Sequence, residues 1–286
     1  MKHIMEFDSG VKLDANKERI IVISSDGKKF EFDKNGAFIE PNREIIQKPS
    51  LVASTAKSRT WDVFDYIKQG HYVDYTPDIA EFVFDGKDTG TDYVHRIETE
   101  KNTIWRVFYV DKTNDRIVIT TQDCVNNVML LGKKGYDRGP EVLHIICGEC
   151  YSNRRLGIKA SSMVLDDVNK ACEYKVKAKD DSYYYYNPTK VNTIVAEILG
   201  DYEGWLASPY VSLYYPQGGA PRDFCLYYAF GRRVAVKVLY YHDDEVACCT
   251  YGARPIVSLC SGLFADVAEK NGIGTSKEKA WKLISD

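Results

Sequence analysis

Short strand-like runs separated by turn residues occupy both ends of the sequence and leave room for only two helical segments between them. From Gly204 to Leu259 the runs are "FCLYYAF", "RRVAVKVLYYH", "EVACCTYG" and "RPIVSLC". The helical segments are "SSMVLDDVNKACEYK", with Ser162 as the expected cap, and "PTKVNTIVAEILG", with Gly200 as the expected stop. Strands, two helices and strands in that order predict an α+β fold.

The stretch before the helices is also rich in strand signals. "TWDVFDYIKQG" has helical spacing, so we expect a helix capped by Thr60 and stopped by Gly70. Four strand regions follow, and the last of them turns back on itself through Lys-Thr-Asn-Asp. They read "HYVDYT", "EFVFDG", "TDYVHRIET" and "TIWRVFYVDKTNDRIVITT".

The first forty residues predict a separate small β-meander. "ERIIVIS", "KKFEFD" and "AFIE" are joined through Asp-Gly and Asn-Gly, which are strong hairpin signals. Residues 41–58 lose periodicity and gain Pro, Ser and Lys, as a linker does. We therefore expect an N-terminal β-rich element with its linker at 1–55 and a larger domain at 56–286.

Composition argues against several classes of function. The net charge of -3 lacks the excess of Lys and Arg that nucleic-acid binding needs. No apolar run approaches the roughly 20 residues that span a bilayer, so we expect no membrane insertion. The N-terminus has no stretch of signal-peptide length, which predicts synthesis in the cytoplasm. Eight cysteines are too sparse for a disulfide scaffold.

No motif for catalysis or for a cofactor stands out. Cys147 and Cys150 form a CxxC, but zinc needs two more ligands at similar spacing, so we interpret them as half-buried thiols near a turn. The acidic run from Asp243 to Glu245 lacks the alternation of a calcium loop and suits a solvated turn. The five histidines lie far apart, and no nucleophile elbow or phosphate loop is present. We expect no metal, no cofactor and no enzyme activity.

Tyrosine is the unusual residue here, with 21 Tyr against 11 Phe. Tyrosine offers broad contact area and a polar end, which favours recognition surfaces, although half-buried strands also use it. The stretch "WLASPYVSLYYPQGG" gathers rings beside Pro and Gly, and Tyr183–Tyr186 are four in succession. Adjacent tyrosines on a strand place one ring on each face. We expect the outer ring of each such pair to be free for contact.

Several segments in order resemble a C-type-lectin-like family. They are "YEGWLASPYV", "DFCLYYAFGRRVAVKVLYY", "YGARPIVSL" and the closing "GIGTSKEKAWKLI", preceded by "GHYVDYT", "TIWRVFYVD" and "IVIT". The resemblance covers roughly residues 60–286 and implies a C-type-lectin-like domain with short antiparallel strands. Such proteins occur in phages and prophages of gut Firmicutes, often as virion components, and share their fold with formylglycine-generating enzymes and with receptor-binding proteins diversified by retroelements.

The resemblance also implies a binding surface. In the diversified proteins variation falls between the W-L-A-S segment and the R-P strand, and this region of the chain carries the polar and aromatic residues Tyr210, Ser212, Tyr214, Tyr215, Gln217, Arg222, Tyr227, Arg232, Tyr240, Tyr241, His242 and Asp243. The implied scaffold residues are Trp205, Leu206, Phe224, Val234, Val236, Val238, Ile256 and Val257. Arg254 is expected to reach backbone carbonyls or an acidic side chain.

Together these features predict a phage virion protein, a head or tail decoration or fibre, that displays a lectin-like domain for attachment to a host-surface glycan or protein. Residues 1–55 would bind other virion proteins, and the protein would be a homo-oligomer, with a trimer favoured. A bacterial surface adhesin of the same fold is one alternative. An enzyme of the formylglycine-generating type is another, although its reactive cysteine pair has no match here: Cys248 and Cys249 are adjacent, and Cys225 is a strand away.

Overall fold

The computed structural model divides the chain into two compact units, Met1–Arg59 and Thr60–Asp286. In the second unit it describes residues 61–90, 94–173, 185–186, 192–212, 223–230, 233–241, 248–266 and 272–284. In the first unit it describes the backbone of five strands. The division falls close to the boundary expected from the sequence. The predicted linker at 41–58 lies outside the described residues.

The five strands of the first unit form one antiparallel sheet in chain order. The runs around Arg19–Ile23, Lys29–Asp33 and Phe38–Ile39 are strands, as the hairpin signals predict. The two strands that precede these runs were not predicted. The residues between those two strands contain no Asp-Gly or Asn-Gly. The strands are β1 (His3–Glu6), β2 (Lys12–Ala15), β3 (Arg19–Ile23), β4 (Lys29–Asp33) and β5 (Phe38–Ile39).

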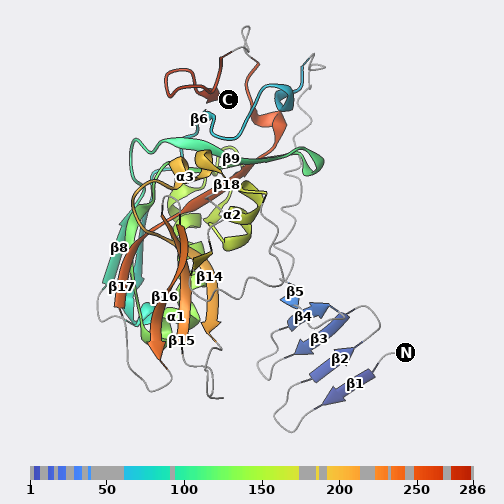
Figure 1. The fold of residues 1–286 in the computed structure, drawn as a ribbon, viewed down its shortest axis with the longest axis vertical. Coiled ribbons are helices and arrows are strands. Elements are labelled where there is room, and N and C mark those ends of the chain that lie inside the picture. Colours follow the sequence, from blue (N-terminus) through green and yellow to red (C-terminus); the bar gives the residue numbers. More distant parts are fainter. Residues whose placement is uncertain are drawn as a thin grey trace. The chain divides into compact units, whose positions relative to one another are not determined.

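The described part of the second unit has α+β architecture, with two six-stranded sheets and a separate hairpin (Figure 1). The hairpin pairs β7 (Glu81–Asp85) with β8 (Val94–Glu98). The first sheet has the order β12 (Ala160–Ser162), β18 (Pro255–Leu259), β10 (Arg116–Thr121), β9 (Trp105–Asp111), β6 (Tyr72–Asp74) and β19 (Trp281–Lys282). The second sheet has the order β11 (Val125–Leu131), β17 (Cys248–Ala253), β14 (Gly204–Ser212), β15 (Asp223–Phe230), β16 (Arg233–Tyr241) and β13 (Tyr185–Tyr186).

The longest helix is one that the sequence analysis missed. Helix α1 runs over Gly132–Tyr151, where three buried glycines and Pro140 lower helix propensity. Tertiary packing overrides that propensity. A Cβ on Gly135 would lie 3.1 Å from the carbonyl carbon of Leu130, and one on Gly139 would lie 3.0 Å from Leu130 Cδ1. The glycines therefore let the helix pack closely against β11, and the expectation of only two helical segments between the strand regions is wrong.

The CxxC lies inside α1, so its placement near a turn is also wrong. Cys147 and Cys150 are on consecutive turns of the helix, and both are buried. Burial raises the pKa of the Cys147 thiol and raises that of Cys150 to about 11. Both groups are therefore neutral core residues at physiological pH.

The two expected helices form, but they are short. Helix α2 covers Leu165–Ala171 and α3 covers Thr193–Leu199, which ends at Gly200 as predicted. Ser162 does not cap α2: it lies in β12, and the Val164 backbone N–H donates to Asp167 Oδ2 at 3.0 Å.

The helix expected at Thr60–Gly70 is a single 3-10 turn over Val63–Asp65. Its cap is Asp62, whose Oδ1 accepts from the Phe64 N–H at 3.0 Å, so the prediction of Thr60 as the cap is wrong. Three further 3-10 turns occur among the described residues, at Gly86–Thr89, Lys112–Asn114 and Ser261–Leu263.

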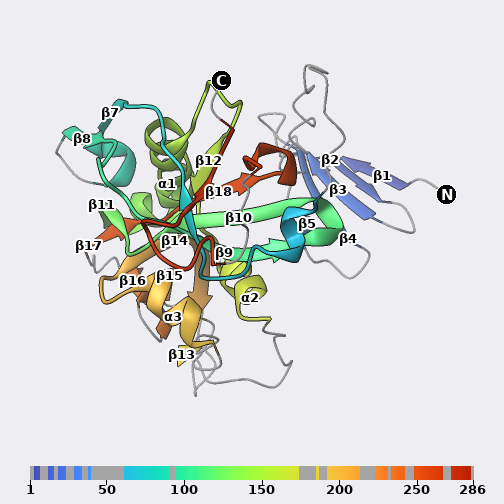
Figure 2. The same ribbon diagram turned by 90° about the horizontal axis from the view of Figure 1, so that it is seen from above.

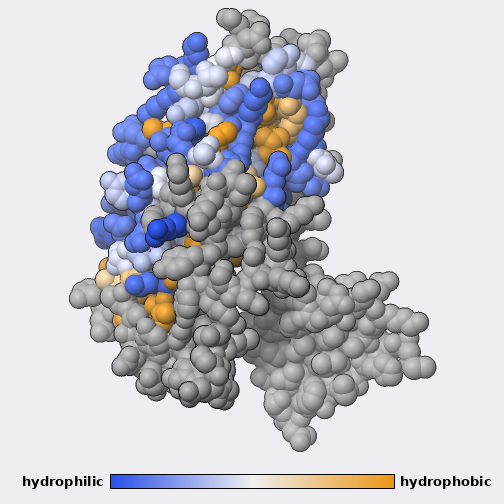
Figure 3. Space-filling model, viewed as in Figure 1, coloured by the Kyte–Doolittle hydropathy of each residue, from blue (hydrophilic) through white to orange (hydrophobic). Residues whose placement is uncertain are grey.

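Both six-stranded sheets of the second unit contribute to two buried clusters. One cluster of buried side chains joins α1 to both sheets, and a second joins α2 and α3 to their opposite faces. Figure 2 shows α1 on one side of β9, β10 and β18, with α2 and α3 on the other. Because both faces of β9 are covered, Trp105 to Tyr109 are buried without alternation. Figure 3 shows that the described outer face is largely hydrophilic, with apolar residues in small separate groups.

Candidate binding surface

Two of the predicted contact segments are anchored at the same end of the second sheet. Ser212 pairs with Asp223, and Asp223 pairs with Tyr241, so β14, β15 and β16 reach this end together. Residues 213–222 connect β14 to β15, and residues 242–247 lead from β16 to β17. We call the position of Ser212, Asp223 and Tyr241 the loop-bearing end. In Figure 1 the arrowheads of β14 and β16 point to it, beside α1.

Three aromatic rings pack together next to the loop-bearing end. Phe224 and Tyr240 are cross-strand partners whose rings stack 4.3 Å apart at 2°. Tyr136 of α1 meets both rings edge-on, with centroid distances of 5.3 Å to Phe224 and 5.9 Å to Tyr240. Burial raises the pKa of Tyr136, so its hydroxyl stays protonated. This ring cluster (Tyr136, Phe224 and Tyr240) fixes the ends of two strands to the helix.

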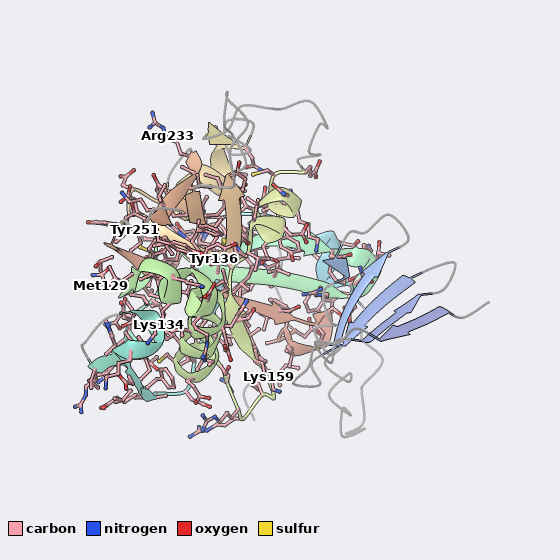
Figure 4. The ribbon with its side chains drawn as sticks, turned by 90° about the horizontal axis from the view of Figure 1, so that it is seen from below. Met129, Lys134, Tyr136, Lys159, Arg233 and Tyr251 are labelled. Carbon is pink, nitrogen blue, oxygen red and sulfur yellow. The ribbon has the colours of Figure 1, made fainter. Side chains whose placement is uncertain are left out.

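The first turn of α1, beside this end, carries two cations. Lys133 and Lys134 are exposed there, the first turn holds no acidic residue, and no side chain caps the helix N-terminus. Cations at a helix N-terminus are unfavourable by about 0.3–1 kcal/mol each, because they face the positive end of the dipole. Figure 4, which looks toward this end, shows Lys134 and Tyr136 on α1 and Arg233 far from both.

Tyr210 and Tyr227 lie on the opposite face of the second sheet from the ring cluster. Their rings meet edge-on at 5.5 Å, and Tyr227 packs against the buried cluster of α2 and α3. Burial raises the pKa of Tyr227 to about 12. Its neighbour Tyr228 packs on the α1 side, with its ring 4.8 Å from that of Tyr251. This pair does place one ring on each face, but neither ring is the free outer ring that we expected, because both faces are covered.

The structure brings together only part of the predicted site. Tyr240 and the backbone of Ser212 and Tyr241 lie at the loop-bearing end, whereas Tyr210 and Tyr227 lie on the other face. Arg232, which follows β15 and precedes β16 in the chain, lies outside the described residues. The remaining predicted residues lie outside the described residues but within the two segments anchored at the loop-bearing end: Tyr214, Tyr215, Gln217, Arg222, His242 and Asp243. Of the Tyr183–Tyr186 run, Tyr185 and Tyr186 form strand β13 beside β16.

Most of the predicted scaffold residues are buried. Trp205, Leu206, Val234 and Val257 have no exposed surface, and Ile256 is 5% exposed. Phe224, Val236 and Val238 are half-buried. The Trp205 indole N–H donates to the Val128 carbonyl at 2.9 Å, which ties β14 to β11.

Arg254 contacts backbone carbonyls, one of the two kinds of partner predicted for it. The side chain is fully buried, and its Nη2 lies 2.7 Å from the carbonyl oxygen of Leu199, 2.8 Å from that of Tyr202 and 3.0 Å from that of Ala229. These carbonyls belong to the end of α3, the turn after it and β15. Gly204 makes room for the side chain, since a Cβ there would lie 2.3 Å from Arg254 Nε. Arg254 therefore ties α3 and the second sheet together.

The described side chains offer little for metal or thiol chemistry. In the ranges where side chains are placed, no group of three or more His, Cys, Asp or Glu could hold a metal ion. The cysteines placed there are free thiols, and Cys225 is fully buried. Burial raises the pKa of Cys172 to about 12 and also raises that of Cys124. A thiol must lose its proton to act as a nucleophile, so these groups are poorly placed for it.

Tyr136, Lys133 and Lys134 were not predicted as neighbours of the site. The signal was present in the apolar spacing of Tyr136, Leu143, Cys147 and Cys150, which is helical. Glycine and proline in the same stretch outweighed it. Among the described residues no helix is long and apolar enough to cross a membrane.

Comparison with known proteins returns no relative. No protein-family model, no curated protein and no solved structure matches this chain. The class of protein is therefore defined here by its architecture alone: an α+β unit of two covered sheets, preceded by a single small sheet.

Proposed function

We propose that the protein is a structural component of a phage virion, a head or tail decoration or fibre, whose second unit is a lectin-like domain for attachment to the host surface. The ligand would be a cell-surface glycan or protein. The observation that carries the proposal is that the Tyr-, Pro- and Gly-containing segment 213–222 begins and ends at the loop-bearing end of the second sheet, from which the acidic segment 242–247 also leads.

A rigid base of this kind suits recognition. Segments whose ends are held by a packed scaffold can vary in sequence without loss of the fold, and binding residues concentrate on such segments. The ring cluster and the burial of Trp205 and Arg254 provide the rigidity. The first and last strands of the unit, β6 and β19, pair with each other, which closes the scaffold.

The contact residues of the proposal are those of the anchored segments. Tyr214, Tyr215 and Gln217 precede Arg222 in the first segment, and His242 and Asp243 open the second. Tyrosine and arginine side chains give large contact area together with directed hydrogen bonds, and both are enriched in the residues that dominate binding energy. Repeated copies on a particle would add weak contacts through avidity.

The attachment function is tested by binding to intact cells. Fluorescently labelled full-length protein is applied to a panel of gut Firmicutes strains, and bound label is measured against concentration. The proposal expects saturable binding to a subset of strains, abolished by an excess of unlabelled protein. If no strain in the panel shows saturable binding, the attachment function is contradicted.

The virion location is tested separately. An antibody raised against the second unit is applied to purified phage particles from cells that carry the gene, with gold-labelled detection by electron microscopy. The proposal expects label at a fixed position on the particles. Particles without label, together with label on the bacterial envelope, would favour the adhesin instead.

A further inference from the structure

The sheet of the first unit has two faces of opposite character. The cross-strand partners Met5–Leu13–Val22–Phe30 form one row, and His3–Ala15–Ile20–Phe32–Phe38 form another two residues along the strands. Because residues two apart on a strand share a face, both rows lie on the same face. We call it the apolar face; among the residues described in these strands, His3 alone on it is polar.

The other face carries the charges of the sheet. Ile4, Asp14, Ile21, Glu31 and Ile39 form its central row. Glu6 is the partner of Lys12, and Arg19 is the partner of Asp33, so opposite charges are paired across strands. A face of this composition is suited to water, whereas the apolar face is not.

A single sheet with one apolar face needs a second layer. Folded domains bury such a face against a helix or another sheet, and a unit of the size of Met1–Arg59 has little else with which to form a core. The described part of the first unit consists of these five strands. The apolar face is therefore the part of the unit that requires a partner.

We infer that the apolar face packs against the same face of another copy of this chain. The face is uncharged, so a copy of itself is a complementary partner, and packing of two such sheets is the arrangement of a β-sandwich. A covered phenylalanine buries about 150–250 Å², so the three on this face, with Met5, Leu13, Ile20 and Val22, reach about the 800 Å² that each partner gives to a stable interface.

This assembly surface deepens the oligomeric part of the proposed function by naming the contact between copies. It does not depend on host attachment, because its test measures the mass of the protein in solution, whereas the cell-binding experiment tests a different surface. A failure of one is therefore distinguishable from a failure of the other.

The test uses neighbouring residues of β3 that lie on opposite faces. Val22→Lys puts a charge between Leu13 and Phe30 on the apolar face. The matched control Ile21→Lys puts the same side chain between Asp14 and Glu31 on the charged face. The full-length proteins are passed over a sizing column with light-scattering detection at several concentrations.

We expect wild type and Ile21→Lys to have a mass that is a multiple of 32.6 kDa, and Val22→Lys to have the mass of one chain. A wild-type protein that is a monomer at all concentrations overturns the inference. An oligomer that persists in Val22→Lys also overturns the inference. Equal dissociation of Val22→Lys and Ile21→Lys overturns it as well. A second pair on β2, Leu13→Lys with Asp14→Lys as control, should behave in the same way.

Because Val22→Lys could also unfold the sheet, wild type alone is measured as well. Hydrogen exchange of the strand amides is followed while the oligomer is diluted until it dissociates. Loss of protection in β2, β3 and β4 on dissociation supports the inference, since the apolar face then lacks its cover. Protection that is unchanged in the dissociated chain means that one chain covers its own apolar face, and this overturns the inference.

Discussion

Replacement of Arg254 tests whether a buried guanidinium organises the second unit. Its Nη2 reaches the carbonyl oxygens of Leu199, Tyr202 and Ala229 at 2.7, 2.8 and 3.0 Å. Arg254→Met keeps a long apolar side chain but removes every donor. Tyr202 is 69% exposed, so water can replace the donor at its carbonyl, whereas Leu199 and Ala229 have no exposed surface. Two buried carbonyls therefore lose a donor that water cannot readily replace.

The expected loss follows from these two carbonyls. A buried acceptor without a partner costs about 1–3 kcal/mol. Removal of the buried cation offsets part of this cost, because burial also lowers the pKa of Arg254 and so disfavours its charged form. We expect the free energy of unfolding to fall by about 3 kcal/mol, which lowers Tm by about 6–12 °C for a unit of this size.

Arg254→Lys is the matched control. All three hydrogen bonds of Arg254 come from one nitrogen, and a lysine ammonium also offers three donors from one nitrogen. The lysine side chain is one bond shorter, so we expect a loss of less than half that of Arg254→Met. Both variants are compared with wild type by urea unfolding and by thermal melting. A methionine variant as stable as wild type, or a lysine variant no better than methionine, would refute this reasoning.

Three further predictions concern other positions in the second unit. Gly200→Ala should lower the free energy of unfolding by about 1–3 kcal/mol in urea titrations, because Gly200 has φ 64° and ψ -166°, a conformation close to glycine-only; unchanged stability would argue against this backbone conformation. Burial lowers the pKa of His71, and its Nδ1 accepts a hydrogen bond from the Trp281 indole N–H at 3.1 Å. The unfolded chain therefore binds a proton at this histidine more readily than the folded chain does. Stability should fall as the pH drops below about 6.5, the ordinary histidine pKa. His71→Asn should flatten this part of the pH profile measured by thermal melting, and an unchanged slope would exclude His71 as its source. Cys147 and Cys150 should resist iodoacetamide at neutral pH in the folded protein and react after unfolding, as read by mass spectrometry; rapid labelling of the folded protein would contradict their burial.

Local signals in the sequence predicted much of the fold. The stop of α3 at Gly200, the strands β15, β16 and β17, and carbonyls as one of two expected kinds of partner for Arg254 were predicted from residue types at known positions. Helix α1 could not be predicted in the same way, because Gly135 and Gly139 are explained only by the close approach of Leu130. Local propensity is weak evidence where tertiary packing decides the outcome.

The candidate site was harder to predict than the fold. Pairs of tyrosines on a strand indicate opposite faces, but the sequence does not say what covers each face. Tyr227 and Tyr228 turned out to lie between layers, whereas the segments around Tyr214 and His242 lead from the loop-bearing end. The difference depends on α1, α2 and α3, which pack on the two faces from distant parts of the chain.

The central claim is that the anchored segments form the contact surface, and a tyrosine comparison tests it most directly. Tyr214→Ser with Tyr215→Ser changes the first segment and leaves Tyr240 in the ring cluster. Tyr202→Ser removes an exposed tyrosine beside the start of β14, at the other end of that strand from Ser212. On a strain that binds the wild-type protein, we expect the double variant to lose at least tenfold in apparent affinity, with Tyr202→Ser unchanged and Tm unchanged in both. Equal binding by all three proteins would contradict the claim.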